Sequence, residues 1–212
     1  MVNLNQLQEA IMSGNLPLSV DLTKQAIAGE IDPGVIINDH MAKAMEEVGA
    51  RFEAGQAFVP QLLIAARAMK GALEILKPLL AGKEGGSQAG TVVIGTVKGD
   101  LHDIGKNLVA SMLEGCGFNV INLGIDISSD QFVEAAKEHK ADIVCLSALL
   151  TTTMVYMKEV IGALETEGIR EGIKIMIGGA PVSQKFADEI GADGYSSNAN
   201  AAVSLAKSLL AS

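Results

Sequence analysis

The chain has 212 residues, of which 49% are hydrophobic, enough for one large or two small domains with buried cores. Its formal net charge of −9 argues against a nucleic-acid partner, because phosphate backbones are bound by clustered Lys and Arg. No apolar run approaches the ~18 residues of a membrane-spanning helix, and no signal-peptide pattern opens the sequence. We therefore expect a soluble, cytoplasmic protein without a membrane partner.

The first part of the chain, residues 1–82, carries only helical patterns. Apolar residues at spacings of three and four predict a first helix near its start and a second that ends near Gly29. Asp32-Pro33 has the cap and proline that open a third helix, which continues to about Phe52. A fourth helix follows Pro60. Four amphipathic helices with short links predict a small helical bundle.

A linker and an alternating pattern follow. Residues 83–90 are predicted to be a flexible linker, because this stretch is rich in Gly and Ser. Strands are predicted at about 91–95, 119–123, 142–147, 173–177 and 193–195, with helices between them and a last helix at about 198–211. Five such units predict a parallel sheet with helices on both faces and a flavodoxin-like (Rossmann-type) strand order. The α/β domain would span residues 91–212.

The loop after the first predicted strand holds the most informative motif, Asp-x-His-x-x-Gly at Asp100, His102 and Gly105. Ligands bind at the carboxyl ends of the strands in open parallel sheets. A carboxylate two residues before an imidazole is typical of a metal ligand and the partner that orients it. For an isolated motif, the alternative is a helix capped by Asp103 beside a surface histidine.

Three further features accompany this motif. Ser147-Ala148-Leu149 ends the third predicted strand, Gly178-Gly179 ends the fourth, and a separate helical segment precedes the whole. With these features, nearly the entire chain resembles the corrinoid (cobalamin) proteins of the methionine synthase type. It is most similar to the small methyl-carrier proteins of anaerobic methyltransferase systems.

The resemblance implies a site. His102 would be the axial cobalt ligand, Asp100 would fix its tautomer, and the Thr153 hydroxyl would bond to Asp100, where methionine synthase carries serine. The cofactor's displaced nucleotide tail would be held by small residues and hydroxyls after the strands. The cofactor-binding residues implied are Asp100, His102, Asp103, Gly105, Ser147, Leu149, Thr151, Thr153, Gly178, Gly179 and Ala199.

The resemblance also implies a function. A carrier of this kind holds a methyl group on cobalamin or a related corrinoid, which alternates between methylcob(III)alamin and cob(I)alamin. Its partners are a substrate methyltransferase, a second methyltransferase that acts on a pterin or thiol acceptor, and a reductive activation protein. Methylamines, methanol, methoxyarenes and betaines remain open as donors. No catalytic acid, base or nucleophile is apparent in the sequence. The resemblance also implies that the helical bundle would cap the cofactor through Phe58 and Val59.

Three other functions are alternatives to the methyl carrier. The small subunit of an adenosylcobalamin-dependent mutase shares the motif, but a mutase leaves the upper face of the cofactor to a barrel, so segment 1–82 argues against it. A cobalamin sensor needs a basic helix-turn-helix. A response regulator needs a phosphate-accepting aspartate at the end of the third strand, where this chain has Cys145-Leu146-Ser147.

Overall fold

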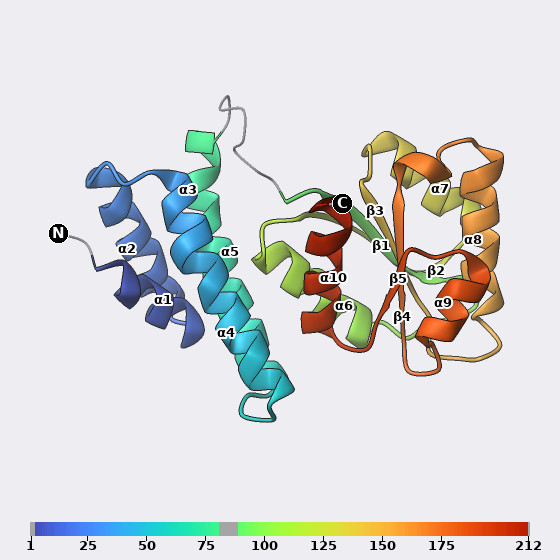
Figure 1. Cartoon of the computed structure of the whole chain (residues 1–212), viewed down its shortest axis with the longest axis horizontal. Coiled ribbons are helices and arrows are strands. Elements are labelled where there is room, and N and C mark those ends of the chain that lie inside the picture. Colours follow the sequence, from blue (N-terminus) through green and yellow to red (C-terminus); the bar gives the residue numbers. More distant parts are fainter. Residues whose placement is uncertain (1–2, 81–88, 212) are drawn as a thin grey trace. The chain divides into compact units, whose positions relative to one another are not determined.

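The computed structural model describes residues 3–80 and 89–211, which divide into a helical unit and an α/β unit (Figure 1). The predicted linker, residues 83–90, lies largely outside the described residues. The helical unit consists of α1 (Leu4–Met12), α2 (Leu16–Ala28), α3 (Pro33–Val35), the π-helix η1 (Ile36–Met41), α4 (Ala42–Glu53) and α5 (Val59–Leu80).

Side-chain caps start the first three helices. The side chains of Asn3, Asn15 and Asp32 accept hydrogen bonds from backbone N–H groups of the following turn. The third predicted helix is present as α3, η1 and α4 without a break in the chain. Its π-helical turn was not predicted, because one extra residue per turn barely changes the apolar spacing.

The α/β unit follows the predicted alternation of strands and helices. Its strands are β1 (Thr91–Val97), β2 (Asn119–Ile127), β3 (Ile143–Ser147), β4 (Lys174–Gly178) and β5 (Gly194–Ser196). Its helices are α6 (Ile104–Gly115), α7 (Ser129–Glu138), α8 (Val155–Thr166), the 3-10 helix η2 (Arg170–Gly172), α9 (Gln184–Ile190) and α10 (Ala199–Ala211).

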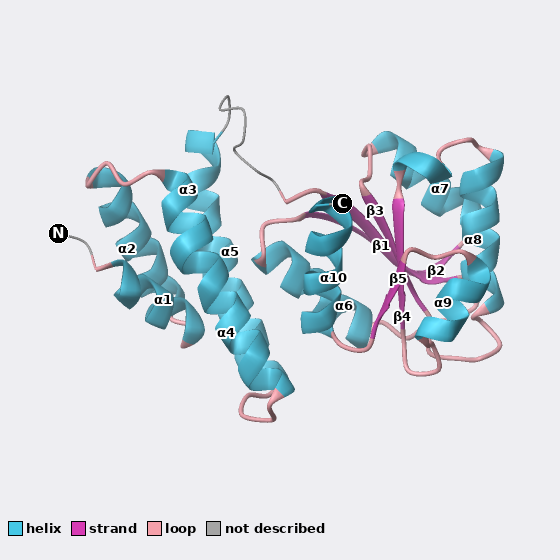
Figure 2. Ribbon diagram, viewed as in Figure 1, coloured by secondary structure: helices cyan, strands magenta, loops and turns pink. Residues whose placement is uncertain are grey.

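All strand pairs are parallel, and the order is β2-β1-β3-β4-β5. This is the flavodoxin-like order, so the predicted fold class is confirmed. Helices α6 and α10 cover one face of the sheet, and α7, α8 and α9 cover the other (Figure 2). The order reverses between β1 and β3, which places the loops after these two strands at the switch point.

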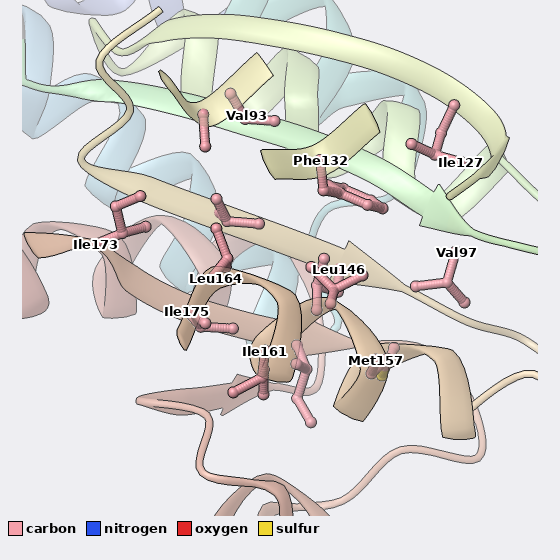
Figure 3. Close-up of a cluster of buried hydrophobic side chains, with 14 of the residues drawn as sticks. Val93, Val97, Ile127, Phe132, Leu146, Met157, Ile161, Leu164, Ile173 and Ile175 are labelled. Carbon is pink, nitrogen blue, oxygen red and sulfur yellow. The ribbon is translucent and has the colours of Figure 1, made fainter. Parts of the chain in front are cut away.

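The core of this unit is aliphatic. Alternate residues of β1, including Val93 and Val97, pack with Phe132 of α7 and with Met157 and Ile161 of α8 (Figure 3). A strand covered on both faces reads as a continuous apolar run, which is why β1 and β3 were recognisable from sequence. Within the described residues, no helix is both long and apolar enough to cross a membrane. The cytoplasmic location stays a prediction.

Candidate functional site

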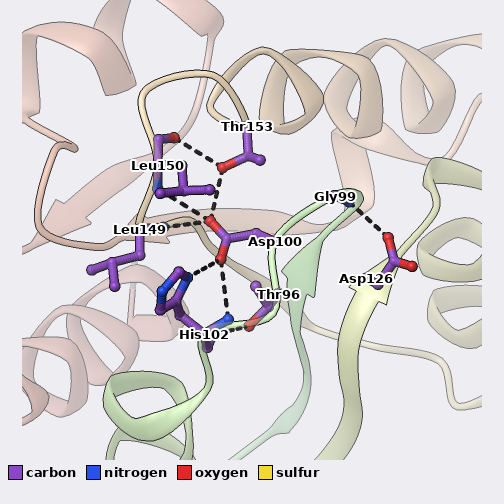
Figure 4. Close-up of polar contacts among 8 residues, drawn as sticks. All are labelled: Thr96, Gly99, Asp100, His102, Asp126, Leu149, Leu150 and Thr153. Atoms are coloured by element: carbon purple, nitrogen blue, oxygen red, sulfur yellow. Dashed lines mark hydrogen bonds and ion pairs between the residues drawn. The ribbon is translucent and has the colours of Figure 1, made fainter.

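A tight turn follows β1 and sets the direction of the loop. The Asp100 N–H donates to the Val97 carbonyl at 3.1 Å, and Gly99 has a φ of +78°. Since Lys98, the second residue of this four-residue turn, has no positive φ, the positive φ at the third residue defines a type II turn and favours glycine there. The turn points the Asp100 side chain back toward the loop after β3 (Figure 4).

The Asp100 carboxylate is fully buried and accepts hydrogen bonds on both oxygens. Oδ1 lies 2.7 Å from His102 Nδ1 and 3.1 Å from the His102 backbone nitrogen. Oδ2 accepts from the backbone N–H groups of Leu149 at 2.7 Å and Leu150 at 3.2 Å, and from Thr153 Oγ1 at 2.8 Å. One carboxylate thus joins the loops after β1 and β3 (Figure 4).

These contacts decide the charge of Asp100. Burial by itself raises the pKa of the carboxyl, but the hydrogen bonds from Leu149, His102 and Thr153 outweigh it and hold the pKa well below its usual range. Asp100 is therefore ionised, and an ionised carboxylate only accepts hydrogen bonds. His102 Nδ1 must then carry a hydrogen and donate it.

The consequence for the neutral His102 ring is a fixed tautomer with an unprotonated Nε2. Within the described residues, the ring's only hydrogen bond is the one to Asp100, so Nε2 is available to another partner. The His102 side chain is 51% exposed, and its backbone carbonyl accepts from Thr96 Oγ1 at 2.9 Å. The imidazole is therefore hydrogen-bonded through Nδ1 and open to a ligand at Nε2.

The surroundings of His102 suit a flat, largely apolar ligand. The loops after β1 and β3 and the adjoining helix ends carry large apolar side chains that are exposed: Leu101, Ile104, Leu149, Leu150 and Val155. A Cβ added at Gly105 would meet no atom within 4 Å, so no contact of the protein itself requires glycine there. A planar ring lying over this loop would use that space.

The donor set fits a metal that brings most of its own ligands. Among the described residues, no group of three or more His, Cys, Asp and Glu side chains is placed to hold a metal ion. A metal at His102 Nε2 must therefore be coordinated mainly by a macrocycle or by solvent. A corrin ring, which supplies four equatorial nitrogens to cobalt, meets this requirement.

The other predicted residues lie near strand ends but outside the Asp100 network. Ser147 and Gly178 end β3 and β4, Thr151 is exposed in the turn before α8, and Ala199 is buried at the start of α10. Asp103 Oδ2 accepts from Asn107 Nδ2 at 2.8 Å.

Gly179 has a reason of its own to be glycine. An added Cβ would lie 1.8 Å from the Ala148 carbonyl oxygen, and its φ is +135°. Packing between the loops therefore requires this glycine whether or not a ligand approaches it.

Sequence reasoning missed a second polar cluster in the same part of the unit. The Lys106 amine is buried and donates to Asn107 Oδ1 at 2.8 Å and Asn122 Oδ1 at 2.6 Å, which ties the start of α6 to β2. It also missed Asp126, whose carboxylate accepts from the Gly99 N–H. The second strand was predicted to end at about residue 123, whereas β2 continues to Ile127, so Asp126 was expected in a loop, where an aspartate is common.

Comparisons with known proteins show the family of the chain. Two family models, both described as B12 binding domain, match residues 90–204 and 4–77. The dimethylamine corrinoid protein 1 of Methanosarcina acetivorans is 50% identical over 183 residues, which cover 86% of this chain and 86% of the relative.

Two solved structures are similar as well. A cobalamin-binding protein from Desulfitobacterium hafniense matches with a TM-score of 0.82 and 32% identity, covering 99% of both chains. The methanol:cobalamin methyltransferase complex of Methanosarcina barkeri matches with a TM-score of 0.81 and 32% identity, over 97% of this chain and 78% of that one. The chain therefore belongs to the B12-binding corrinoid proteins of methyltransferase systems, and its cofactor is cobalamin or a related corrinoid.

Proposed function

We propose that this protein carries a methyl group between a substrate-specific methyltransferase and a second methyltransferase that acts on a pterin or thiol acceptor. When bound, the corrinoid supplies the chemistry, since its cobalt can accept and release a methyl group. The chain's own residues bind the cofactor and orient it. The single observation that carries the proposal is the exposed His102 imidazole held through Nδ1 by the buried Asp100.

In this proposal His102 Nε2 is the lower axial ligand and Asp100 is the group that orients it. Asp100 is itself fixed by three donors from the loop after β3, at Leu149, Leu150 and Thr153. A ligand whose partner is held this firmly keeps its tautomer and ring orientation without a rearrangement of the loop. The Thr153 hydroxyl also lies 2.9 Å from the Leu150 carbonyl, so its hydrogen can be shared between two acceptors.

The remaining predicted residues are assigned to the cofactor tail and the ring surface. Gly105 leaves open space beside the loop, and exposed apolar side chains such as Leu149 and Ile104 suit the ring. Asp103, Ser147, Thr151, Gly178, Gly179 and Ala199 complete the proposed contacts of the tail. No described residue is assigned a catalytic role in this proposal, in which the protein is a carrier subunit.

We also propose the boundaries and role of the helical region. Residues 1–82 form a cap and residues 91–212 the cofactor-binding domain, with residues 83–90 as the linker between them in the sequence. Phe58 is 64% exposed and Val59 is 40% exposed, and such apolar side chains suit contact with a corrin ring. Shielding by this region would keep solvent from the methyl group.

The methyl donor proposed is a methylated amine, because the relative with 50% identity is named for dimethylamine. A reductive activation protein is also among the proposed partners. The acceptor methyltransferase remains either pterin- or thiol-specific in this proposal.

Single-turnover mixing tests the proposal. The chain loaded with cob(I)alamin should gain one methyl group per cobalt only when a dimethylamine methyltransferase and its substrate are added. It should lose that group only when a second methyltransferase and its acceptor follow. Methyl transfer from amine to acceptor by the loaded chain alone, at the rate of the full system, would contradict the carrier function.

A further inference from the structure

Asp126, near the end of β2, has a backbone conformation that needs an explanation. Its φ is +56°, and the side chain lies on the exposed part of the strand. A residue with a Cβ rarely adopts a positive φ, because the conformation costs free energy unless surrounding contacts hold it. Asp126 therefore makes contacts that outweigh this cost.

Two hydrogen bonds connect Asp126 to the turn after β1. The Gly99 N–H donates to Asp126 Oδ1 at 2.7 Å, and the Asp126 N–H donates to the Asp100 carbonyl at 3.1 Å. The register between β1 and β2 shifts twice just before this point, at Ile94/Gly95 and at Gly95/Val97. At these irregularities Asp126, which lies between the paired residues Gly124 and Ile127, comes beside the turn (Figure 4).

The Gly99 contact selects one form of the turn. A type II turn and a type I turn differ by a flip of the central peptide, here the one between Lys98 and Gly99. The turn's own hydrogen bond, from Asp100 to Val97, does not use the Gly99 N–H. The Asp126 carboxylate accepts this N–H and so favours the flip state with a positive φ at Gly99.

We propose that Asp126 is a positioning residue for corrinoid coordination. It fixes the peptide between Lys98 and Gly99 and the carbonyl of Asp100, and through Asp100 it holds the His102 imidazole at the orientation that coordinates cobalt. This inference rests on the proposed role of His102 as the axial ligand. The contrasting possibility is that Asp126 only stabilises the fold.

Three substitutions in the full-length chain separate these possibilities. Asp126→Gly removes the acceptor and also relieves the positive φ. A loss of His102 coordination in this variant therefore cannot be attributed to backbone strain. Asp126→Asn keeps an acceptor oxygen and tolerates this conformation. Lys140→Gly is the matched control, because Lys140 is an exposed residue with a φ of +49° in a different loop.

Two measurements are made on each variant. Amide hydrogen exchange at Gly99 is followed by NMR without cofactor. The ratio of His-coordinated to uncoordinated cobalt is measured by electron paramagnetic resonance (EPR) after loading with cob(II)alamin. Asp126→Gly should speed Gly99 exchange about 10-fold, the effect of losing one hydrogen bond to a charged acceptor. It should lower the coordination ratio about threefold to tenfold, less than loss of a direct partner of the ligand.

Asp126→Asn should stay close to the parent protein in both measurements, and Lys140→Gly should change neither. If Asp126→Gly does not fold, Asp126→Ala also removes the acceptor, and Lys140→Ala, which likewise places a Cβ at a positive φ, becomes its matched control. A coordination ratio in the folded acceptor-deleted variant equal to that of the parent overturns the positioning role and leaves the axial-ligand proposal intact. If the parent protein itself shows no His102 coordination, the axial-ligand proposal fails and the positioning role fails with it.

Discussion

The two units of this protein bury polar side chains of different kinds. In the described part of the helical unit, the buried polar side chains are Ser19 and Thr23, whose hydroxyls donate to backbone carbonyls one turn earlier in α2. In the α/β unit, Thr96, Asp100, Lys106 and Thr153 are buried, and two of them are charged. The buried hydroxyls of the helical unit donate to residues four positions away, whereas the Thr153 hydroxyl of the α/β unit donates to Asp100 in a distant segment.

The difference shows where the chemistry of the molecule resides. Thr23 bonds to a residue four positions away, but Thr153 bonds to a carboxylate 53 positions away. A contact over such a separation is retained only if the fold already brings both loops together, as the strand order does at the switch point. The polar groups that are oriented across distant segments lie in the α/β unit.

The largest expected effect follows from removal of Asp100. Asp100→Ala should lower the free energy of unfolding by about 3 kcal/mol, because the part-buried N–H groups of Leu149 and Leu150 and the buried Thr153 hydroxyl lose their acceptor. It should also abolish His102 coordination. Urea unfolding and the visible spectrum of the loaded protein measure the two effects. A variant as stable as the parent would show that the loops after β1 and β3 do not depend on this carboxylate.

The pH dependence of stability also tests how much the ionised Asp100 stabilises the α/β unit. Because the pKa of Asp100 is lowered in the folded state, its stabilisation is present above the unfolded-state pKa of about 3.9 and is lost as the pH falls below that value. The parent protein should therefore lose more stability than Asp100→Asn between about pH 5 and pH 3. Equal slopes for the two proteins in this range would mean that Asp100 is not unusually acidic.

Two of the buried threonines, Thr23 and Thr153, allow a matched comparison between the units. Thr153→Val should cost about 1 kcal/mol of stability and shift His102 toward the uncoordinated state, because Asp100 loses a donor. Thr153→Ser should restore both, since it keeps the hydroxyl. Thr23→Val removes a hydroxyl that bonds only within α2 and should leave coordination unchanged. Equal effects of the two valine variants on coordination would remove the distinction drawn between the units.

The smallest effect on stability is expected at Gly105. Gly105→Ala should stabilise the cofactor-free protein by about 0.5 kcal/mol, because alanine is the better helix former and its Cβ meets no other atom. It should nevertheless weaken corrinoid binding, because the methyl group would occupy the space proposed for the ring. Thermal unfolding and a binding titration give the two values. Unweakened binding would place the ring away from Gly105.

The fold and the central motif were predictable because each depends on a local pattern. The apolar run of β1 predicted a strand, and the glycines and polar residues after it predicted a ligand loop. Asp100 and His102 were recognisable as a pair because they are two positions apart. The Asp100–Thr153 bond was expected only through the family resemblance. The Leu149 and Leu150 donors were not identified as such, since every residue except proline has an N–H group and the sequence does not show where it points.

Asp126 and Lys106 were missed for a related reason. Their contacts depend on the register between β1 and β2, which is irregular at Gly95 and is not encoded in any single segment. Lys106 also looks like an ordinary surface lysine of an amphipathic helix. Its burial becomes evident only when Asn122 of β2 is placed beside it.

The central claim is that His102 supplies the axial ligand, and EPR tests it most directly. The chain contains three histidines, so protein labelled with ¹⁵N only at histidine gives one isotopic signature to all imidazoles and none to the cofactor. Loaded with unlabelled cob(II)alamin, it should show each cobalt line split into two by a single ¹⁵N nucleus, and His102→Ala should lose this splitting. A splitting into three, from the cofactor's own ¹⁴N base, or a doublet that persists in His102→Ala, would contradict the account.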